Sequence, residues 1–203
     1  MIPLGDVSRR PTRFPIVTLI IIVICFAVFV IELTDGDAFV TKWSMIPAHL
    51  SAGRDYVTVV TAMFMHASWS HILGNMVFFW AFGPEIEEAM GPGPYAFFYL
   101  AGGILAMLGQ YAVDPHSTVP NLGASGAIAA VMGASIVTYP RDTIRTILVL
   151  VVFVRVAYVS AALLIGLWFL LQLLSLGTVA ESQSAGVAYV VRLRLRRAVW
   201  AAV

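Results

Sequence analysis

The chain has 203 residues, of which 60% are hydrophobic and only 11% are charged, and its formal net charge is +1. Soluble domains carry about a quarter charged residues, so this composition predicts a polytopic membrane protein, and the balanced charge gives no reason to expect a nucleic-acid partner. The single cysteine, Cys25, excludes an intramolecular disulfide and a zinc site built from cysteines. We expect neither a metal nor another cofactor.

Apolar runs without charged residues predict five membrane spans. In chain order they cover residues 15–33, 68–82, 94–113, 122–139 and 159–176. The connection 34–70 is aromatic and amphipathic, so we expect it to lie in the membrane interface. Residues 143–160 are apolar but interrupted by Arg145 and Arg155, which predicts a loop leading into the fifth span. The expected fold class is therefore all-α, a polytopic bundle of five clear spans inside a membrane domain at 14–185.

Arginines near the N-terminus predict how this bundle is oriented. Arg9, Arg10 and Arg13 precede the first span, and the positive-inside rule then places the segment 1–13 in the cytoplasm. Alternation of the spans puts the connection 34–70 outside and Arg141 inside.

The C-terminal segment 186–203 has the length of a sixth span but not its chemistry. It contains four arginines, Arg192, Arg194, Arg196 and Arg197. Insertion scales assign about 2.5–3.5 kcal/mol to each arginine at the middle of a span. At about 100° per residue these side chains also scatter around a helix instead of forming one polar face. We predict that this Arg-rich tail forms no stable span.

Ser125 lies between small residues, Gly123, Ala124 and Gly126, near the external start of the fourth predicted span. The first turn of a helix offers unpaired backbone N–H groups and a positive dipole end, which favour an oxyanion formed there. Ser125 is therefore a candidate nucleophile. The alternative is that this stretch only lets helices approach one another closely.

His71 and Asn75 share one face of the second predicted span because they are four residues apart. An imidazole and a carboxamide can both donate hydrogen bonds to a developing negative oxygen. The alternative is a pair of hydrogen bonds between helices. With Ser125 expected at the same depth, the combination favours a catalytic site.

A general base for this serine is harder to find. A serine hydroxyl is a weak nucleophile until a neighbouring base accepts its proton, yet all four histidines precede Ser125 in the chain: His49, His66, His71 and His116. His66 or His71 could approach as a substitute base, since base and nucleophile need only come within hydrogen-bond reach.

Several segments resemble the rhomboid family of bacterial intramembrane serine proteases. They are FMHASWSHILGNM at 64–76, GPEIEEAMG at 83–91 and GASGAI at 123–128, with WSMIP at 43–47 and GLWFLLQ at 166–172. The resemblance implies a six-helix core in the plasma membrane with a water-filled cavity open to the outside. In it Ser125 would attack a peptide bond in the transmembrane segment of a substrate, and His71, Asn75 and the Ser125 backbone N–H would stabilise the oxyanion. The same motifs contain the supporting residues His66, Glu87, Gly123 and Gly126.

The resemblance ends where rhomboids carry their general base, a histidine of the sixth span in an Ala-His-x-x-Gly motif. Gly186 to Tyr189 is similar to the start of that span, but residues 190–197 contain neither histidine nor glycine. Our hypothesis is a frameshifted or truncated gene end; an intact reading frame without a nearby histidine codon would refute it. Two functions follow: an intramembrane serine endopeptidase, or a non-catalytic rhomboid-like protein (a pseudoprotease) that binds transmembrane segments.

Overall fold

The computed structural model describes residues 2–6, 11–150 and 153–172. The chain divides into two units, Met1–Ala161 and Ala162–Val203. In the second unit the described residues belong to one short apolar helix, Ala161–Gln172. The predicted Arg-rich tail at 186–203 lies outside the described residues.

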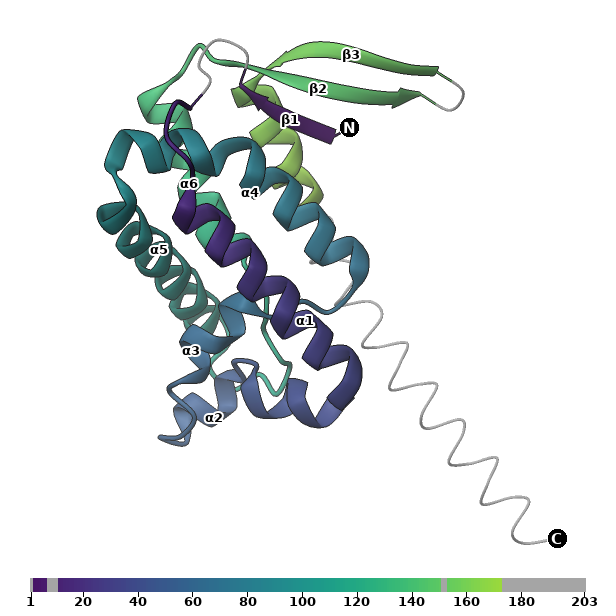
Figure 1. The fold of residues 1–203 in the computed structure, drawn as a ribbon. Helices are drawn as coiled ribbons and strands as arrows, with labels where there is room; N and C mark the ends of the chain where they lie inside the picture. The colour runs from purple at the N-terminus through teal and green to yellow at the C-terminus, as the bar shows by residue number, and fades with distance from the viewer. Residues whose placement is uncertain (1, 7–10, 151–152, 173–203) are drawn as a thin grey trace, which may run out of the picture. The chain divides into compact units, whose positions relative to one another are not determined.

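The first unit is mainly helical. Its helices are α1 (Ile16–Trp43), α2 (Pro47–Ser51), α3 (Thr58–Thr61), the 3-10 helix η1 (Ala62–Phe64), α4 (Trp69–Met90), α5 (Pro92–Val113) and α6 (Ser125–Thr138). Helix α6 packs against both α4 and α5, and α1 packs against α4 and α5 as well (Figure 1). Ser125, at the start of α6, therefore lies on an inner helix of the bundle.

Large aromatic side chains fill the core between α1, α4 and α5. Five of them are at most 2% exposed: Phe29, Phe79, Phe82, Tyr95 and Tyr99. The close approach of α5 and α6 depends on small residues, because a Cβ atom added at Gly126 would collide with the Cβ of Ala106. This is the packing that small residues allow between membrane helices.

The predicted spans correspond to helices, but only partly to helices of spanning length. Two helices are long and apolar enough to cross a membrane, Ile16–Trp43 and Pro92–Val113, among the residues described. Ser125–Thr138 and Ala161–Gln172 are shorter apolar helices. The first helix also continues into the predicted interfacial connection and reaches Trp43, with a kink at Gly36, whose φ of 61° and ψ of −146° are not helical.

The expectation of a purely helical chain was wrong, because the first unit contains a three-stranded antiparallel sheet. Strands β1 (Ile2–Asp6), β2 (Thr143–Leu150) and β3 (Phe153–Ser160) pair in the order β1-β2-β3. The predicted loop at 143–160 is thus a hairpin, and the predicted N-terminal segment supplies the third strand. β-Branched residues are frequent in both arms of this hairpin, and such residues favour strands. The loop was predicted because Arg145 and Arg155 interrupt the apolar run, and this interruption outweighed the strand preference of the β-branched residues.

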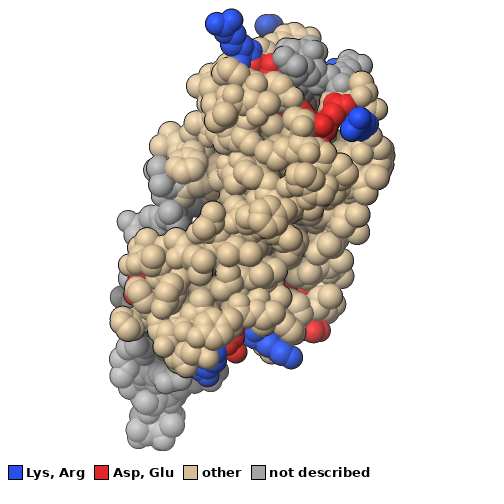
Figure 2. Space-filling view, turned by 90° about the vertical axis from the view of Figure 1, so that its left-hand side faces the viewer, with Lys and Arg blue, Asp and Glu red and all other residues tan. Residues whose placement is uncertain are grey.

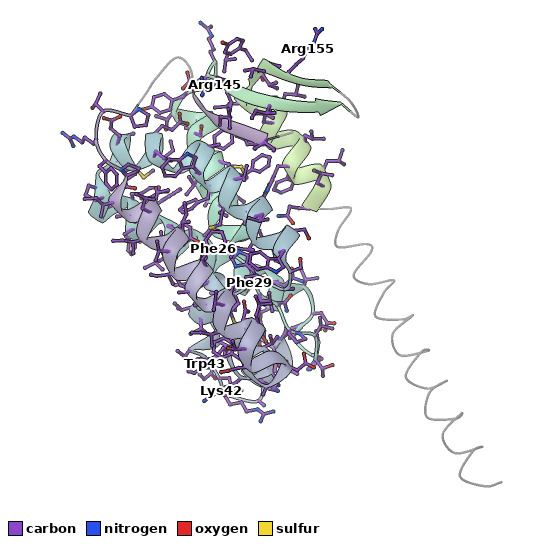
Figure 3. All side chains as sticks on the ribbon, turned by 45° about the vertical axis from the view of Figure 1, so that its right-hand side comes forward. Phe26, Phe29, Lys42, Trp43, Arg145 and Arg155 are labelled. Atoms are coloured by element: carbon purple, nitrogen blue, oxygen red, sulfur yellow. The ribbon has the colours of Figure 1, made fainter. Side chains whose placement is uncertain are left out.

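Figure 2 shows one face of the molecule, on which charged side chains gather at two ends with an uncharged band between them. The sheet lies at one of these ends, beyond the N-terminus of α1 (Figure 1). Lys42 and Trp43, at the C-terminus of α1, mark the opposite end (Figure 3). We call these the sheet end and the site end.

Candidate active site

Ser125 is the first residue of α6, and the backbone before it is held by two other segments of the chain. The backbone of Asn121 exchanges hydrogen bonds with Met45 at 2.8 and 3.0 Å, and the N–H of Gly123 donates to the carbonyl of Ala62 at 2.8 Å. These hydrogen bonds therefore fix the turn before Ser125 relative to Met45 and to η1. The Ser125 hydroxyl forms no hydrogen bond with the described part of the chain, which leaves it available for a reacting group.

Gly123 is the point where the two candidate groups come together. Its φ of 132° belongs to a region that residues with a side chain rarely adopt. A Cβ atom placed there would lie 2.9 Å from Cε1 and 3.0 Å from Nε2 of His71, and 3.9 Å from Oγ of Ser125. The imidazole of His71 and the Ser125 hydroxyl thus border the same small space. That space exists only because residue 123 is glycine.

His71 is positioned by the start of α4. Ser68 is the N-cap of this helix, and its hydroxyl accepts a hydrogen bond from the His71 backbone N–H at 3.2 Å. A serine N-cap satisfies one of the free N–H groups of the first turn. It therefore fixes the first turn of α4, which carries His71.

Asn75 follows one turn later and is almost completely buried, at 2% exposure. Its Nδ2 group donates to none of the residues that the structure describes. A buried amide donor without a partner is unfavourable by about 1–3 kcal/mol, so this group favours an acceptor that binds beside it.

His66 lies directly behind His71. Their rings meet edge to face, with centroids 5.1 Å apart, and His66 is 1% exposed. Its backbone N–H donates to the carboxylate of Glu32 at 3.0 Å, which ties this segment to α1. Burial, together with the neighbouring His71, lowers the pKa of His66 to about 4. The imidazole of His66 is therefore neutral near pH 7 and acts as packing for His71.

Two of the predicted supporting residues stand apart from this group. Gly126 faces Ala106 of α5 and sets the helix spacing. Glu87 lies about 24 Å along α4 from His71 at 1.5 Å per residue. Its carboxylate accepts hydrogen bonds from the backbone N–H groups of Val17 and Thr18, at 2.9 and 2.8 Å. Glu87 thus binds the start of α1, far from the serine.

The sequence reasoning missed the groups that hold the site in place: Glu32, the Ala62 carbonyl and the Met45 backbone. Glu32 had a detectable signal, because it is an acidic residue at the end of an apolar run. The other two act through their backbone atoms, and side-chain patterns carry no trace of such contacts.

The arrangement combines a free hydroxyl at a helix start with an imidazole beside it and a buried amide donor on the same helix as that imidazole. Donors directed at one point can stabilise the oxyanion of acyl transfer. The first backbone N–H groups of α6 add further donors. Such a site is suited to attack by the serine on a carbonyl carbon.

Comparison with known proteins bears on the family of this chain. The Rhomboid domain matches residues 53–190. The Rhomboid protease GlpG of Yersinia pestis (strain Pestoides F) is 28% identical over 116 residues, which cover 57% of this chain and 41% of GlpG. The Putative rhomboid protease YdcA of Bacillus subtilis (strain 168) is 30% identical over 82 residues, 40% of this chain and 41% of that protein. The alignments span about two fifths of the length of these curated relatives. The domain match covers more than half of the chain, which therefore belongs to the rhomboid family.

Proposed function

We propose that this protein is an intramembrane serine endopeptidase that cleaves transmembrane segments of other membrane proteins, with Ser125 as the nucleophile. Rhomboid membership and the apolar helices make the chain an integral membrane protein. The single observation that carries the proposal is the space over Gly123, which the His71 imidazole and the Ser125 hydroxyl border together.

In the proposed reaction the Ser125 oxygen attacks the carbonyl carbon of the scissile peptide bond, and the hydroxyl proton passes to a base. The carbonyl oxygen becomes an oxyanion, which accepts hydrogen bonds from His71, Asn75 and the Ser125 N–H. Collapse of this intermediate breaks the carbon–nitrogen bond and returns the proton to the leaving amine. Water then hydrolyses the ester formed on Ser125.

We further propose that the site end faces the outside of the cell. The described side chains at the sheet end include four exposed arginines, Arg13, Arg141, Arg145 and Arg155. The basic side chains described at the site end are Lys42 and Arg54, and they are accompanied by four exposed carboxylates, Asp35, Asp37, Asp55 and Asp114. Cytoplasmic loops carry the excess of basic residues. This asymmetry therefore supports a cytoplasmic sheet end and a bacterial plasma membrane location.

A second candidate function is the binding of transmembrane segments without cleavage. It is favoured by one observation: no histidine follows Ser125 in the sequence, whereas activation of a serine needs a base within reach. The retained combination of Ser125, His71 and Asn75 favours the peptidase.

A serine-directed fluorophosphonate probe tests the proposal in protein reconstituted into lipid vesicles. We expect covalent labelling that Ser125→Ala abolishes and His71→Ala strongly reduces. Ser51→Ala is the matched control, because Ser51 is an exposed serine of α2 whose hydroxyl contacts none of these groups, and it should label as the unmodified protein does. Folded protein that does not label, but that a photoreactive transmembrane peptide crosslinks without being cleaved, would establish the second function instead.

A further inference from the structure

Four arginines at the sheet end share one property: their side chains are exposed. They are Arg13, Arg141, Arg145 and Arg155, which we call the inner arginine cluster. Within the described part of the chain none of their guanidinium groups forms an ion pair. Figure 3 shows Arg145 and Arg155 on the sheet, at the opposite end of the molecule from Lys42.

The carboxylates described at this end do not balance those charges on the surface. Glu85, Glu87 and Asp142 are buried, at 8% exposure or less. Glu85 accepts a hydrogen bond from the Ser135 hydroxyl at 2.7 Å. Glu88 is half-buried and accepts hydrogen bonds from the backbone of Thr12 at 3.0 Å and Arg13 at 3.3 Å. Glu85, Glu87 and Asp142 are thus directed into the fold, whereas Glu88 lies near Arg13 and offsets part of its charge. With four described arginines against this one carboxylate, the described surface at this end remains positive although the chain is almost neutral.

Two arginines of the cluster lie close to the ends of helices. Arg13 precedes the start of α1 at Ile16, and Arg141 follows the end of α6 at Thr138. Each is three residues of non-helical chain away from its helix, a separation of at most about 10 Å. In the proposed orientation, both guanidinium groups would therefore stand near the phosphates of the adjoining leaflet.

The sheet carries the remaining two arginines on opposite faces: Arg145 shares a face with an interfacial set of side chains, whereas Arg155, which pairs with Leu148, lies on the other face. Arg145 is directly opposite Tyr158 in the pairing of β2 and β3, so the two side chains share one face. Ile2, Ile147 and Val156 are paired across all three strands in the next row of the same face. Tyr158 is 65% exposed and Val156 56% exposed. Arginine, tyrosine and aliphatic residues on one exposed face are typical of a surface that lies at a bilayer interface.

We propose that the inner arginine cluster binds the headgroups of anionic phospholipids in the leaflet at the sheet end. The bilayer borders this end of any membrane-embedded rhomboid-family chain, and its phosphates complement the unpaired guanidinium groups. Each arginine near an anionic surface strengthens binding about fivefold. The occupant is the lipid itself and not an acidic protein segment, because two of the four arginines stand at the helix ends where the headgroups are.

Native mass spectrometry of the purified full chain, titrated with phosphatidylglycerol or phosphatidylcholine, tests this surface. We expect phosphatidylglycerol to be retained preferentially. The double variant R145Q/R155Q should lower its affinity by about 25-fold at low ionic strength, and salt should reduce the effect. The matched control K42Q/R54Q removes the same charge from the site end and should leave the affinity unchanged.

Equal losses in the two double variants, or no preference for phosphatidylglycerol in the unmodified chain, would overturn the proposal. If R145Q/R155Q does not fold, R145K/R155K keeps the charge on the sheet, and it should retain most of the affinity. If folded R145K/R155K lost as much phosphatidylglycerol affinity as is expected for R145Q/R155Q, this would contradict electrostatic binding. A soluble acidic peptide that displaces phosphatidylglycerol and binds more tightly would replace the lipid by a protein partner.

Discussion

The hydrogen bonds of Glu87 predict how much the start of α1 depends on α4. One carboxylate oxygen accepts the backbone N–H of Val17 at 2.9 Å, and the other accepts both the N–H and the hydroxyl of Thr18 at 2.8 Å. The N-cap residue of α1, Pro15, provides no side-chain cap of its own. The carboxylate of a neighbouring helix therefore performs the capping.

Replacement of Glu87 by alanine would leave the backbone N–H groups of Val17 and Thr18 without this acceptor, while the Thr18 hydroxyl keeps Tyr95 at 3.3 Å. The position is buried, since Glu87 is 5% and Thr18 0% exposed. A hydrogen bond to a charged group contributes about 1.5–3 kcal/mol, and bonds that share one carboxylate are not additive. We expect Glu87→Ala to lower the free energy of unfolding by about 3–4 kcal/mol. Glu87→Gln keeps one carbonyl oxygen for Thr18 but turns an NH₂ group toward Val17. We therefore expect Glu87→Gln to lower the free energy of unfolding by about 1–2 kcal/mol.

Unfolding in mixed micelles of a mild detergent and dodecyl sulfate, followed by tryptophan fluorescence, measures these losses. Glu88→Ala is the matched control, because the carboxylate of this half-buried residue also accepts backbone hydrogen bonds, from Thr12 and Arg13, but these bonds are open to solvent. Its effect should be less than half that of Glu87→Ala. If the two alanine variants lose the same stability, the buried cap has no special role and the reasoning fails.

Three further predictions concern the site and the packing around it. Gly123→Ala forces an unfavourable φ and drives the new methyl group into the His71 ring, so fluorophosphonate labelling should slow about 100-fold, as expected for a reacting group displaced by about 1 Å; unchanged labelling would exclude the shared space. The unfolded chain binds a proton near the ordinary histidine pKa of 6.5, whereas folded His66 binds one only near pH 4, so up to about 3 kcal/mol of stability should be lost through this residue as the pH falls from 6.5 to 4. Replacement of His66 by glutamine should reduce the loss, and replacement of the exposed His116 by glutamine should not. Gly126→Val should lower the melting temperature more than Gly133→Val, because a Cβ atom meets Ala106 at position 126 and nothing within 4 Å at position 133.

Helical segments were predictable wherever the apolar pattern was long and unbroken. The runs at 15–33 and 94–113 became α1 and α5, with bounds that differ by two residues or fewer except at the end of α1. The extension of α1 to Trp43 was missed because Asp35 and Asp37 end the apolar pattern, while a helix whose side chains face water tolerates both.

The sheet was not predictable from hydropathy because its pairing is non-local. β1 pairs with β2, more than a hundred residues later in the chain, and a short N-terminal strand carries little signal by itself. For the candidate site, sequence spacing placed His71 and Asn75 on one face of a helix. The approach of His71 to Ser125 depends on the backbone conformation of Gly123, which spacing does not encode.

The site therefore depends on the connection between α1 and α4 as much as on the helices. Ser125 is held through Gly123, whose N–H donates to Ala62 of η1, and η1 leads within a few residues to His66, which packs on His71. The same short segment thus fixes the nucleophile on one side and the imidazole on the other. A change that loosens η1 should displace both groups together. It should therefore slow the labelling of Ser125 strongly while it lowers the free energy of unfolding only slightly. Changes in helix packing such as Gly126→Val should do the opposite: they should lower the free energy of unfolding strongly and slow labelling less, because they disturb the contact between α5 and α6 and not the segment that holds the two groups.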